Sequence, residues 1–369
     1  MKKLVHTILL YLNYALAVFL LLADVSVYIS PAKIWLAAFF GLAFPYLVVL
    51  NFLFFIYWIA RKNRAFMVSL IVLVLSINNI SHTYQPPKSK TDELKRKVQV
   101  HSSKSLKVLS YNVQVFNLFG NNTFGEHQEK IFDYISGQEP DVICFQEFYV
   151  NETKSAGIEK ISNYLKDYPH KHIVWVKSGE YSNYGIAIYS KHQLINKQYV
   201  DFPNSDNISI FCDVTMNSDT VRIFNNHLQS INFDNESYRF ISNQRSYTRS
   251  EKLKEIQNIS LQLRDAFIKR GIQAEFIADE IQASQYPVII CGDFNDTPVS
   301  YSYYRLRGNH KDAFLEAGSG FGSTYKGKFP SYRIDFILHS QSLETLSFRT
   351  DKIKLSDHYP IMAEIMYQN

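Results

Sequence analysis

The chain has 369 residues, of which 46% are hydrophobic, and its formal charge at pH 7 is +5. The aromatic and aliphatic content excludes a disordered protein, and only three cysteines exclude a disulfide-stabilised scaffold. Residues 1–85 and residues 86–107 each carry a net charge of +5, whereas residues 108–369 carry −5. The positive charge therefore avoids the part that is long enough to form a large core, which excludes a generally basic protein that coats nucleic acid.

The first 85 residues contain long apolar runs. Asp24 is the only charged residue between 4 and 29, and residues 34–60 contain none. About 20 apolar residues cross a bilayer, so both runs are long enough. A third run, 65–80, reaches that length only if the polar residues up to about 82 lie among the headgroups. We predict a membrane anchor over residues 1–83, with two to three transmembrane helices at about 4–29, 34–60 and 65–82.

The alternative for the first run is a cleaved signal peptide. Its apolar stretch exceeds the usual length of roughly 7–15 residues, and a second run follows almost at once, which favours a membrane span. Lys2 and Lys3 together with the basic loop 61–64 favour a cytoplasmic N-terminus and a cytoplasmic second loop. We therefore expect a multi-pass membrane protein whose C-terminal part lies outside the cytoplasm. The basic cluster 95–97 argues for the opposite orientation, but long domains translocate largely regardless of charge.

Residues 84–106 form a basic linker, which could attract anionic lipid headgroups or simply be a solvated stalk. After it, short apolar runs separated by turn residues predict strands. Helical periodicity appears at 126–135 and at 253–281, where Gly271 is a candidate break between two helices. The pattern predicts an α+β layered domain. The expected strands are 107–111, 142–145, 185–189, 221–224, 288–291, 334–338 and 361–365.

Polar residues stand where these apolar strands end. They are Asn112, Glu147, His227, Asp293 with Asn295, and the pair Asp357-His358; Asp335 instead lies inside an apolar run. Carboxylate and amide oxygens suit Mg²⁺, Mn²⁺ or Ca²⁺, and no Cys or His pair has zinc spacing. Each residue alone could be an ordinary cap or turn. Together, converging on one cleft, they predict metal-assisted hydrolysis of a phosphate ester.

The same residues carry a resemblance to a known family. The sequence is similar to the endonuclease/exonuclease/phosphatase superfamily, which includes DNase I-like nucleases, neutral sphingomyelinases and inositol-polyphosphate phosphatases. The resemblance implies a four-layer α/β/β/α sandwich over residues 107–369. The motifs that match, in the family's order, are Ser110-Tyr111-Asn112, Gln146-Glu147, Asn226-His227-Leu228, Gly292-Asp293-Phe294-Asn295, Arg333-Ile334-Asp335-Phe336-Ile337 and Ser356-Asp357-His358-Tyr359-Pro360.

The resemblance also implies residue roles. The metal, Mg²⁺ before Mn²⁺ or Ca²⁺, would be held by Glu147 with Asn112 and Asp357. Asp293 would orient or deprotonate the attacking water, Asn295 would help to bind the phosphate, and His358 would contact the scissile phosphate. Asp335 would fix the tautomer of His358. His227 would lie near the leaving group, and Tyr184 near the phosphate.

Two departures separate the chain from the abasic-site repair nucleases of the superfamily: Phe148-Tyr149 follows Gln146-Glu147, and His227 is present. We expect a membrane-tethered, metal-dependent phosphoesterase, with a lipid headgroup or small phosphoester as the preferred substrate. The alternatives are an extracytoplasmic DNase I-like nuclease and a catalytically inactive binding module. The implied partners are the bilayer and the substrate; nucleic acid enters only as a substrate, and no protein partner is implied. Aromatic and basic residues after His227 could cradle an anionic substrate, or they could form the solvated face of a lid or helix start: Tyr238, Arg239, Arg245, Tyr247 and Arg249.

Overall fold

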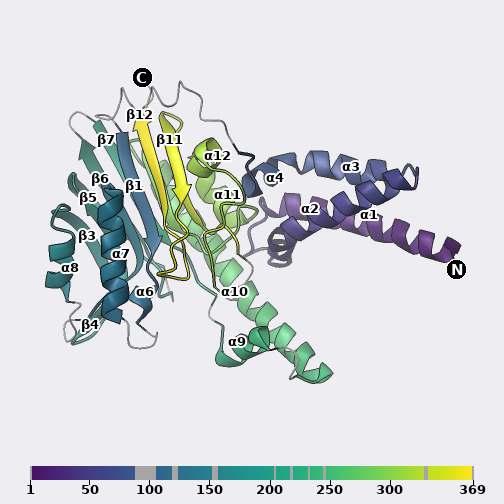
Figure 1. Ribbon diagram of the computed structural model, residues 1–369, viewed down its shortest axis with the longest axis horizontal. Coiled ribbons are helices and arrows are strands. Elements are labelled where there is room, and N and C mark those ends of the chain that lie inside the picture. Colours follow the sequence, from purple (N-terminus) through teal and green to yellow (C-terminus); the bar gives the residue numbers. More distant parts are fainter. Residues whose placement is uncertain are drawn as a thin grey trace.

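The computed structural model describes residues 2–87, 105–118, 124–151, 157–202, 205–216, 219–231, 233–243, 247–327 and 331–367. Most of the predicted basic linker, residues 88–104, lies outside these ranges. Figure 1 shows a bundle of N-terminal helices beside a layered domain of strands and helices. The two parts are described in turn.

The layered domain is built on two six-stranded sheets. One parallel pair lies inside each sheet, β1 with β2 and β7 with β8, and the other pairings are antiparallel. The first sheet has the order β11 (Leu343–Thr350), β12 (Ile361–Tyr367), β1 (Ser105–Asn112), β2 (Val142–Asn151), β4 (Ser182–Ser190), β3 (His170–Ser178). The second has the order β5 (Gln193–Val200), β6 (Ser209–Met216), β7 (Asp219–His227), β8 (Val288–Asp293), β10 (Asp335–His339), β9 (Lys311–Asp312).

Three apolar clusters define four layers. One cluster joins the facing sides of the sheets and includes Val108, Ile223 and Ile337. A second lies between the first sheet and the helices α7 (Phe124–Gln138) and α8 (Ile158–Tyr164). A third lies between the second sheet and the helices α10 (Arg249–Gln282) and α11 (Tyr301–Arg307). The predicted α/β/β/α sandwich is confirmed. Short helices complete it: α6 (Gln114–Asn117), α9 (Asn235–Ser242) and α12 (Ala313–Ala317).

The predicted break at Gly271 is wrong. Helix α10 runs through this residue without interruption, from a capping box formed by Thr248 and Glu251. Gly271 has a packing role instead, because a Cβ atom there would lie 3.0 Å from the ring of Pro31. The glycine therefore lets the N-terminal segment approach α10 closely.

The predicted anchor, called the anchor below, consists of α1 (Lys2–Ser26), α2 (Leu36–Ala60), α3 (Phe66–Leu75) and α4 (Ile77–Thr83). Helices α1 and α2 are each long and apolar enough to cross a membrane. The predicted third helix is bent by 64° between α3 and α4, and it would make a third span only if the pair crosses as one unit. The lone acid, Asp24, accepts hydrogen bonds from Ser76 at 2.5 Å and Asn79 at 2.8 Å, so it joins α1 to the bend.

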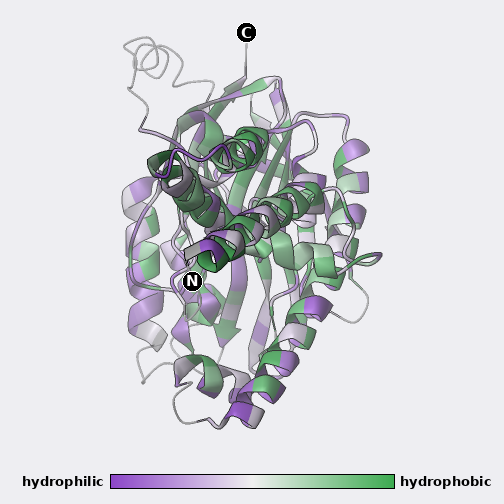
Figure 2. Cartoon of the chain, turned by 90° about the vertical axis from the view of Figure 1, so that its right-hand side faces the viewer, coloured by the Kyte–Doolittle hydropathy of each residue, from purple (hydrophilic) through white to green (hydrophobic). Residues whose placement is uncertain are grey.

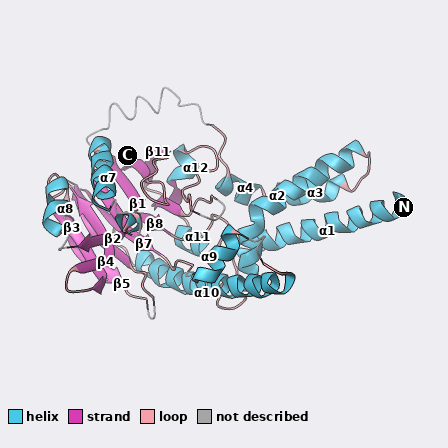
Figure 3. Ribbon diagram, turned by 60° about the horizontal axis from the view of Figure 1, so that its bottom comes forward, coloured by secondary structure: helices cyan, strands magenta, loops and turns pink. Residues whose placement is uncertain are grey.

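The anchor packs directly on the sandwich. Phe39 of α2 meets Phe267 of α10 edge to face at 5.2 Å. Arg333 donates to the carbonyl of His82 at 3.0 Å, and Gln85 forms a bridge with Gly320. Figure 2 looks along these helices and shows their mostly apolar surface, while Figure 3 shows α9 and α10 extending towards the same side of the sandwich as the anchor.

Candidate active site

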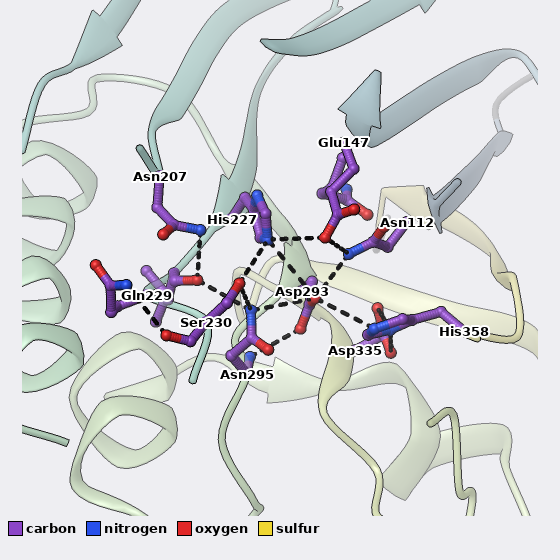
Figure 4. Close-up of polar contacts among 12 residues, drawn as sticks. Asn112, Glu147, Asn207, His227, Gln229, Ser230, Asp293, Asn295, Asp335 and His358 are labelled. Carbon is purple, nitrogen blue, oxygen red and sulfur yellow. Dashed lines mark hydrogen bonds and ion pairs between the residues drawn. The ribbon is translucent and has the colours of Figure 1, made fainter. Parts of the chain in front are cut away.

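The two parallel strand pairs bring their carboxyl ends to one edge of the sandwich. Asn112 is the last residue of β1, His227 of β7 and Asp293 of β8. His227 stands opposite Asp293 in the β7–β8 register, and Asp335 stands opposite Asp293 in the antiparallel β8–β10 register. Figure 4 shows these side chains pointing toward one another across the junction of the two sheets.

Glu147 reaches the site by a different route from the predicted one. It does not end a strand, because β2 continues to Asn151. The register with β4 shifts between Phe145 and Phe148, and Glu147 adopts a left-handed backbone conformation with φ of 54°. Such an irregularity redirects side chains within a strand and is common beside active sites. Asp335 likewise begins β10 rather than lying inside it.

His358 is held between two buried carboxylates. Its Nδ1 lies 3.0 Å and 3.2 Å from the two carboxylate oxygens of Asp335, and its Nε2 lies 3.6 Å from Oδ2 of Asp293. Burial alone would lower the pKa of His358, but Asp335 and Asp293 outweigh it and raise the pKa well above its ordinary value. The two carboxylates therefore favour the protonated form of this ring.

Asp293 lies at the centre of the hydrogen bonds in the site. It accepts hydrogen bonds from the Asn112 side chain at 2.9 Å, from the Asn295 side chain at 3.3 Å and from the backbone N–H of Asn295 at 2.8 Å. Burial raises the pKa of Asp293, although His358 opposes the rise. On the other side, Nε2 of His227 lies 3.9 Å from Asp293 and 3.4 Å from the hydroxyl of Ser230. Burial lowers the pKa of His227 to about 4, so this ring is neutral.

Glu147 and Asp357 form an acidic pair. Burial, and then the charge of Asp357, raises the pKa of Glu147 to about 7. In the described part of the chain, neither carboxylate forms an ion pair with a lysine or arginine. Two carboxylates whose charges raise the pKa of one of them are oxygen donors that a divalent cation would stabilise, so these residues fit the metal that the sequence predicts.

Asn112 is placed beside that pair but as a hydrogen-bond donor. Its amide nitrogen donates to Glu147 at 3.3 Å as well as to Asp293, while its oxygen accepts from the Gln114 amide at 3.0 Å. It would offer an oxygen to a metal only after its amide group turned over. Asp293, Asp335 and His358 also lie close enough together to hold an ion. We assign Asp335 and His358 to each other instead, because both oxygens of Asp335 already lie 3.0 Å and 3.2 Å from Nδ1 of His358.

One buried cation was missed by the sequence analysis. Arg270 of α10 donates to the carbonyl of Asn295, whose φ is 52°, and lies 3.4 Å from Asp296. It holds in place the backbone turn that presents Asn295. A signal for it was available: Arg270 follows Phe267 by three residues and precedes Ala274 by four, so it is a charged residue on the apolar face of the helix.

The remaining predicted residues contribute less. Burial, and then the charge of Glu147, raises the pKa of Tyr184 on β4. The active-site residues line a cavity, but Tyr184 is not part of its lining. Of the aromatic and basic set after His227, Tyr238 lines that cavity. Arg239 and Tyr247 instead contact Glu236, at 3.7 Å and 2.6 Å, and Arg245 lies outside the described residues. All three cysteines are buried and free.

The chain that forms this sandwich and this site matches a known protein family. The model of the endonuclease/exonuclease/phosphatase family matches residues 109–358, so the chain belongs to that family, whose members are generally hydrolases of phosphoester bonds and generally use divalent metals. Residues 6–83 match a domain of unknown function, DUF8431. The comparison with curated proteins gave no match.

Solved structures share the fold. An endonuclease/exonuclease/phosphatase from Beutenbergia cavernae has 14% identity and a TM-score of 0.53, with 72% of each chain covered. Humanised TDP2 from Danio rerio has 14% identity and a TM-score of 0.50 over 71% of this chain and 98% of its own. TDP2 from Caenorhabditis elegans has 17% identity and a TM-score of 0.50 over 86% and 93%. At these identities the likeness supports the fold alone.

Proposed function

We propose that the chain is a membrane-anchored phosphoesterase that depends on a divalent metal and hydrolyses a phosphodiester or phosphomonoester. The observation that carries the proposal is the position of the buried His358, whose Nδ1 lies 3.0 Å from Asp335 and whose Nε2 lies 3.6 Å from Asp293, next to the acidic pair Glu147 and Asp357. A positive donor beside an anionic metal site is suited to bind a phosphate and to stabilise the charge that develops during hydrolysis.

Each residue of the site has a distinct role in the proposed hydrolysis. Asp293, oriented by Asn112 and Asn295, accepts a proton from the attacking water. His358 donates a hydrogen bond to a phosphate oxygen. The side-chain nitrogen of Asn295 keeps one hydrogen on the Leu228 carbonyl at 3.0 Å, and its second hydrogen, shared at 3.3 Å between Asp293 and Ser230, turns to another phosphate oxygen. His227 is neutral and lies on the opposite side of Asp293 from His358, where its Nε2 can exchange a proton with the leaving group (Figure 4).

The metal would be held by Glu147 and Asp357, with Asn112 as a third ligand if its amide turns over. When bound, the ion would supply positive charge to the phosphate and the attacking oxygen. Mg²⁺ is the preferred ion because the donors are oxygen atoms, and Mn²⁺ or Ca²⁺ are the alternatives.

The membrane arrangement is part of the same proposal. Helices α1, α2 and the bent pair α3–α4 would cross the bilayer, so that the sandwich lies outside the cytoplasm. The basic loop 61–64 and the N-terminal lysines support this orientation. An alkaline phosphatase fused after Gln85 should be active, whereas an inactive fusion would place the sandwich in the cytoplasm.

The activity is tested with the full chain in lipid nanodiscs. The wild type is expected to hydrolyse bis(p-nitrophenyl) phosphate with Mg²⁺, to lose activity in EDTA and to lose it on His358→Ala. Plasmid DNA and RNA are assayed in parallel. Cleavage of nucleic acid lost on His358→Ala, without turnover of other esters, would identify the nuclease instead. No turnover of any substrate and no heat of Mg²⁺ binding would leave an inactive binding module.

A further inference from the structure

The active-site residues open into a cavity of about 540 Å³. This volume falls within the range of roughly 300–1,000 Å³ that is usual for ligand sites. One end of the cavity is polar and consists of residues already assigned to the reaction. These are Glu147, Asp293, Asn295, Asp357 and His358.

The opposite wall belongs to the membrane anchor. It is formed by Phe39, Leu42, Ala43 and Tyr46 of α2. Their spacing of three, one and three residues places them on one face of the helix, so a continuous stripe of α2 faces the active site. Leu263 and Phe267 of α10 extend the apolar surface, and the edge-to-face contact between Phe39 and Phe267 joins the two helices.

Exposed aromatic residues indicate where this wall lies relative to the bilayer surface. Tyr28, Trp35 and Tyr84 are 63%, 40% and 42% exposed, and all lie near the ends of the anchor helices that face the sandwich. Tyrosine and tryptophan are enriched at the boundary between a membrane and water. Trp35 contacts Phe39, the first residue of the wall, so the wall begins where α2 would enter the bilayer and continues along the helix to Tyr46.

One buried hydroxyl in the lining has no hydrogen-bond partner. The hydroxyl of Thr297 makes no hydrogen bond within the described part of the chain. Thr297 lines the cavity. Buried polar atoms in proteins are almost always paired, so this hydroxyl is suited to an oxygen acceptor of a molecule in the cavity.

We propose that the substrate is an amphiphilic phosphoester, whose phosphate lies at His358 and Asp293 and whose apolar chain lies along α2 and α10 toward the bilayer. This inference rests on the proposed function and narrows its substrate class. The anchor then supplies part of the substrate site in addition to attachment. Burial of an apolar chain contributes about 0.8 kcal/mol per methylene, which is about fourfold in binding, so chain length should control the rate at low substrate concentration.

The experiment uses the full chain in nanodiscs with Mg²⁺ and three p-nitrophenyl phosphodiesters, in which the second ester group is methyl, octyl or thymidine. For the wild type we expect kcat/KM to be at least about tenfold higher for the octyl ester than for the methyl ester. Ala43→Phe fills the cavity and should reduce this octyl-to-methyl ratio about fivefold or more. Ala60→Phe makes the same change at the exposed far end of α2, 14 residues beyond Tyr46, and should preserve the ratio.

The control separates binding in the cavity from simple partition into the lipid, because partition affects both variants equally. If the melting temperature shows that Ala43→Phe does not fold, the octyl-to-methyl ratio is measured for Leu42→Ser instead. This variant removes apolar surface from the same wall and should lower the ratio. Equal rates for the methyl and octyl esters, a ratio unchanged in the wall variant, or a preference for the thymidine ester would overturn the inference and leave the proposed function standing. Failure to hydrolyse any of the esters would instead refute the proposed function, and this inference with it.

Discussion

Replacing Asp335 by asparagine tests the hydrogen-bonded histidine. The substitution preserves the size of the side chain and removes the negative charge that lies 3.0 Å from Nδ1 of His358. The asparagine amide can also donate to Nδ1, which favours the neutral ring with its proton on Nε2. Asp335→Asn therefore changes the charge of His358 and largely retains the position of its ring.

The size of the effect follows from this geometry. Two unit charges 3.0 Å apart interact by roughly 5 kcal/mol at an effective dielectric constant of about 20. Removing one partner of a buried pair costs about 3–5 kcal/mol, which agrees with this value. Asp293 remains 3.6 Å from Nε2 and retains part of the stabilisation. We expect a fall in kcat of about 10²- to 10⁴-fold, the range for loss of a positioned acid–base group.

The assay is hydrolysis of bis(p-nitrophenyl) phosphate by the full chain in nanodiscs, with kcat and KM determined separately. A loss concentrated in kcat, with a melting temperature close to that of the wild type, supports the assignment. Histidine NMR shifts provide a second measurement, because the variant should show His358 neutral at pH 7. The reasoning is refuted if Asp335→Asn retains more than about one third of the wild-type kcat, or if His358 stays protonated in it.

Three further outcomes follow from contacts in the structure. Glu147→Gln and Asp357→Asn should each weaken Mg²⁺ binding at least about tenfold by calorimetry, since each removes a charged oxygen donor; wild-type affinity in both variants would place the metal elsewhere. Arg270→Met should lower the free energy of unfolding by about 3–5 kcal/mol, because it leaves Asp296 buried without its cation; an unchanged melting curve would contradict this pairing. Glu316 is distant from the metal residues. Burial would raise its pKa, but hydrogen bonds from His339 and the Thr345 amide and the charge of Lys311 lower it to about 2. Because a lowered carboxyl pKa stabilises the fold above the ordinary value of 4.5, this contribution should vanish between about pH 5 and pH 2. The melting temperatures of the wild type and Glu316→Gln should converge over that range, and a constant difference would show that the carboxylate charge does not contribute.

Most interior strands of the fold could be predicted from the sequence, and the edge strands could not; the buried interior strand β6 was also missed. Strands β1, β2, β7 and β8 are rich in apolar residues because sheet or helix covers both of their faces. Strands β3, β5 and β11 lie at sheet edges with partly exposed faces, and β5 is mostly exposed, so their sequences resemble loops. The bend between α3 and α4 was missed because an apolar run does not record a change of direction.

The same distinction applies to the site. Residues that follow central strands converge because the strand ends converge, and His227, Asp293 and Asp335 are placed by register alone. Glu147 depends on a shift in register against β4, which is a property of the strand pair and not of β2 by itself. The wall formed by α2 depends on how the anchor docks. No local pattern specifies that contact, although the stripe from Phe39 to Tyr46 takes part in it.

Two glycines show how closely that docking is specified. A Cβ atom at Gly41 would lie 2.4 Å from the carbonyl oxygen of Val299, and one at Gly271 would lie 3.0 Å from Pro31. One glycine brings α2 against the sandwich and the other brings α10 against the segment before α2. Between these contacts, Phe39 meets Phe267 and closes the apolar side of the cavity. Because a larger residue at either position would separate surfaces that line the cavity, the anchor is not interchangeable with an unrelated tether: its position helps to determine the shape of the site.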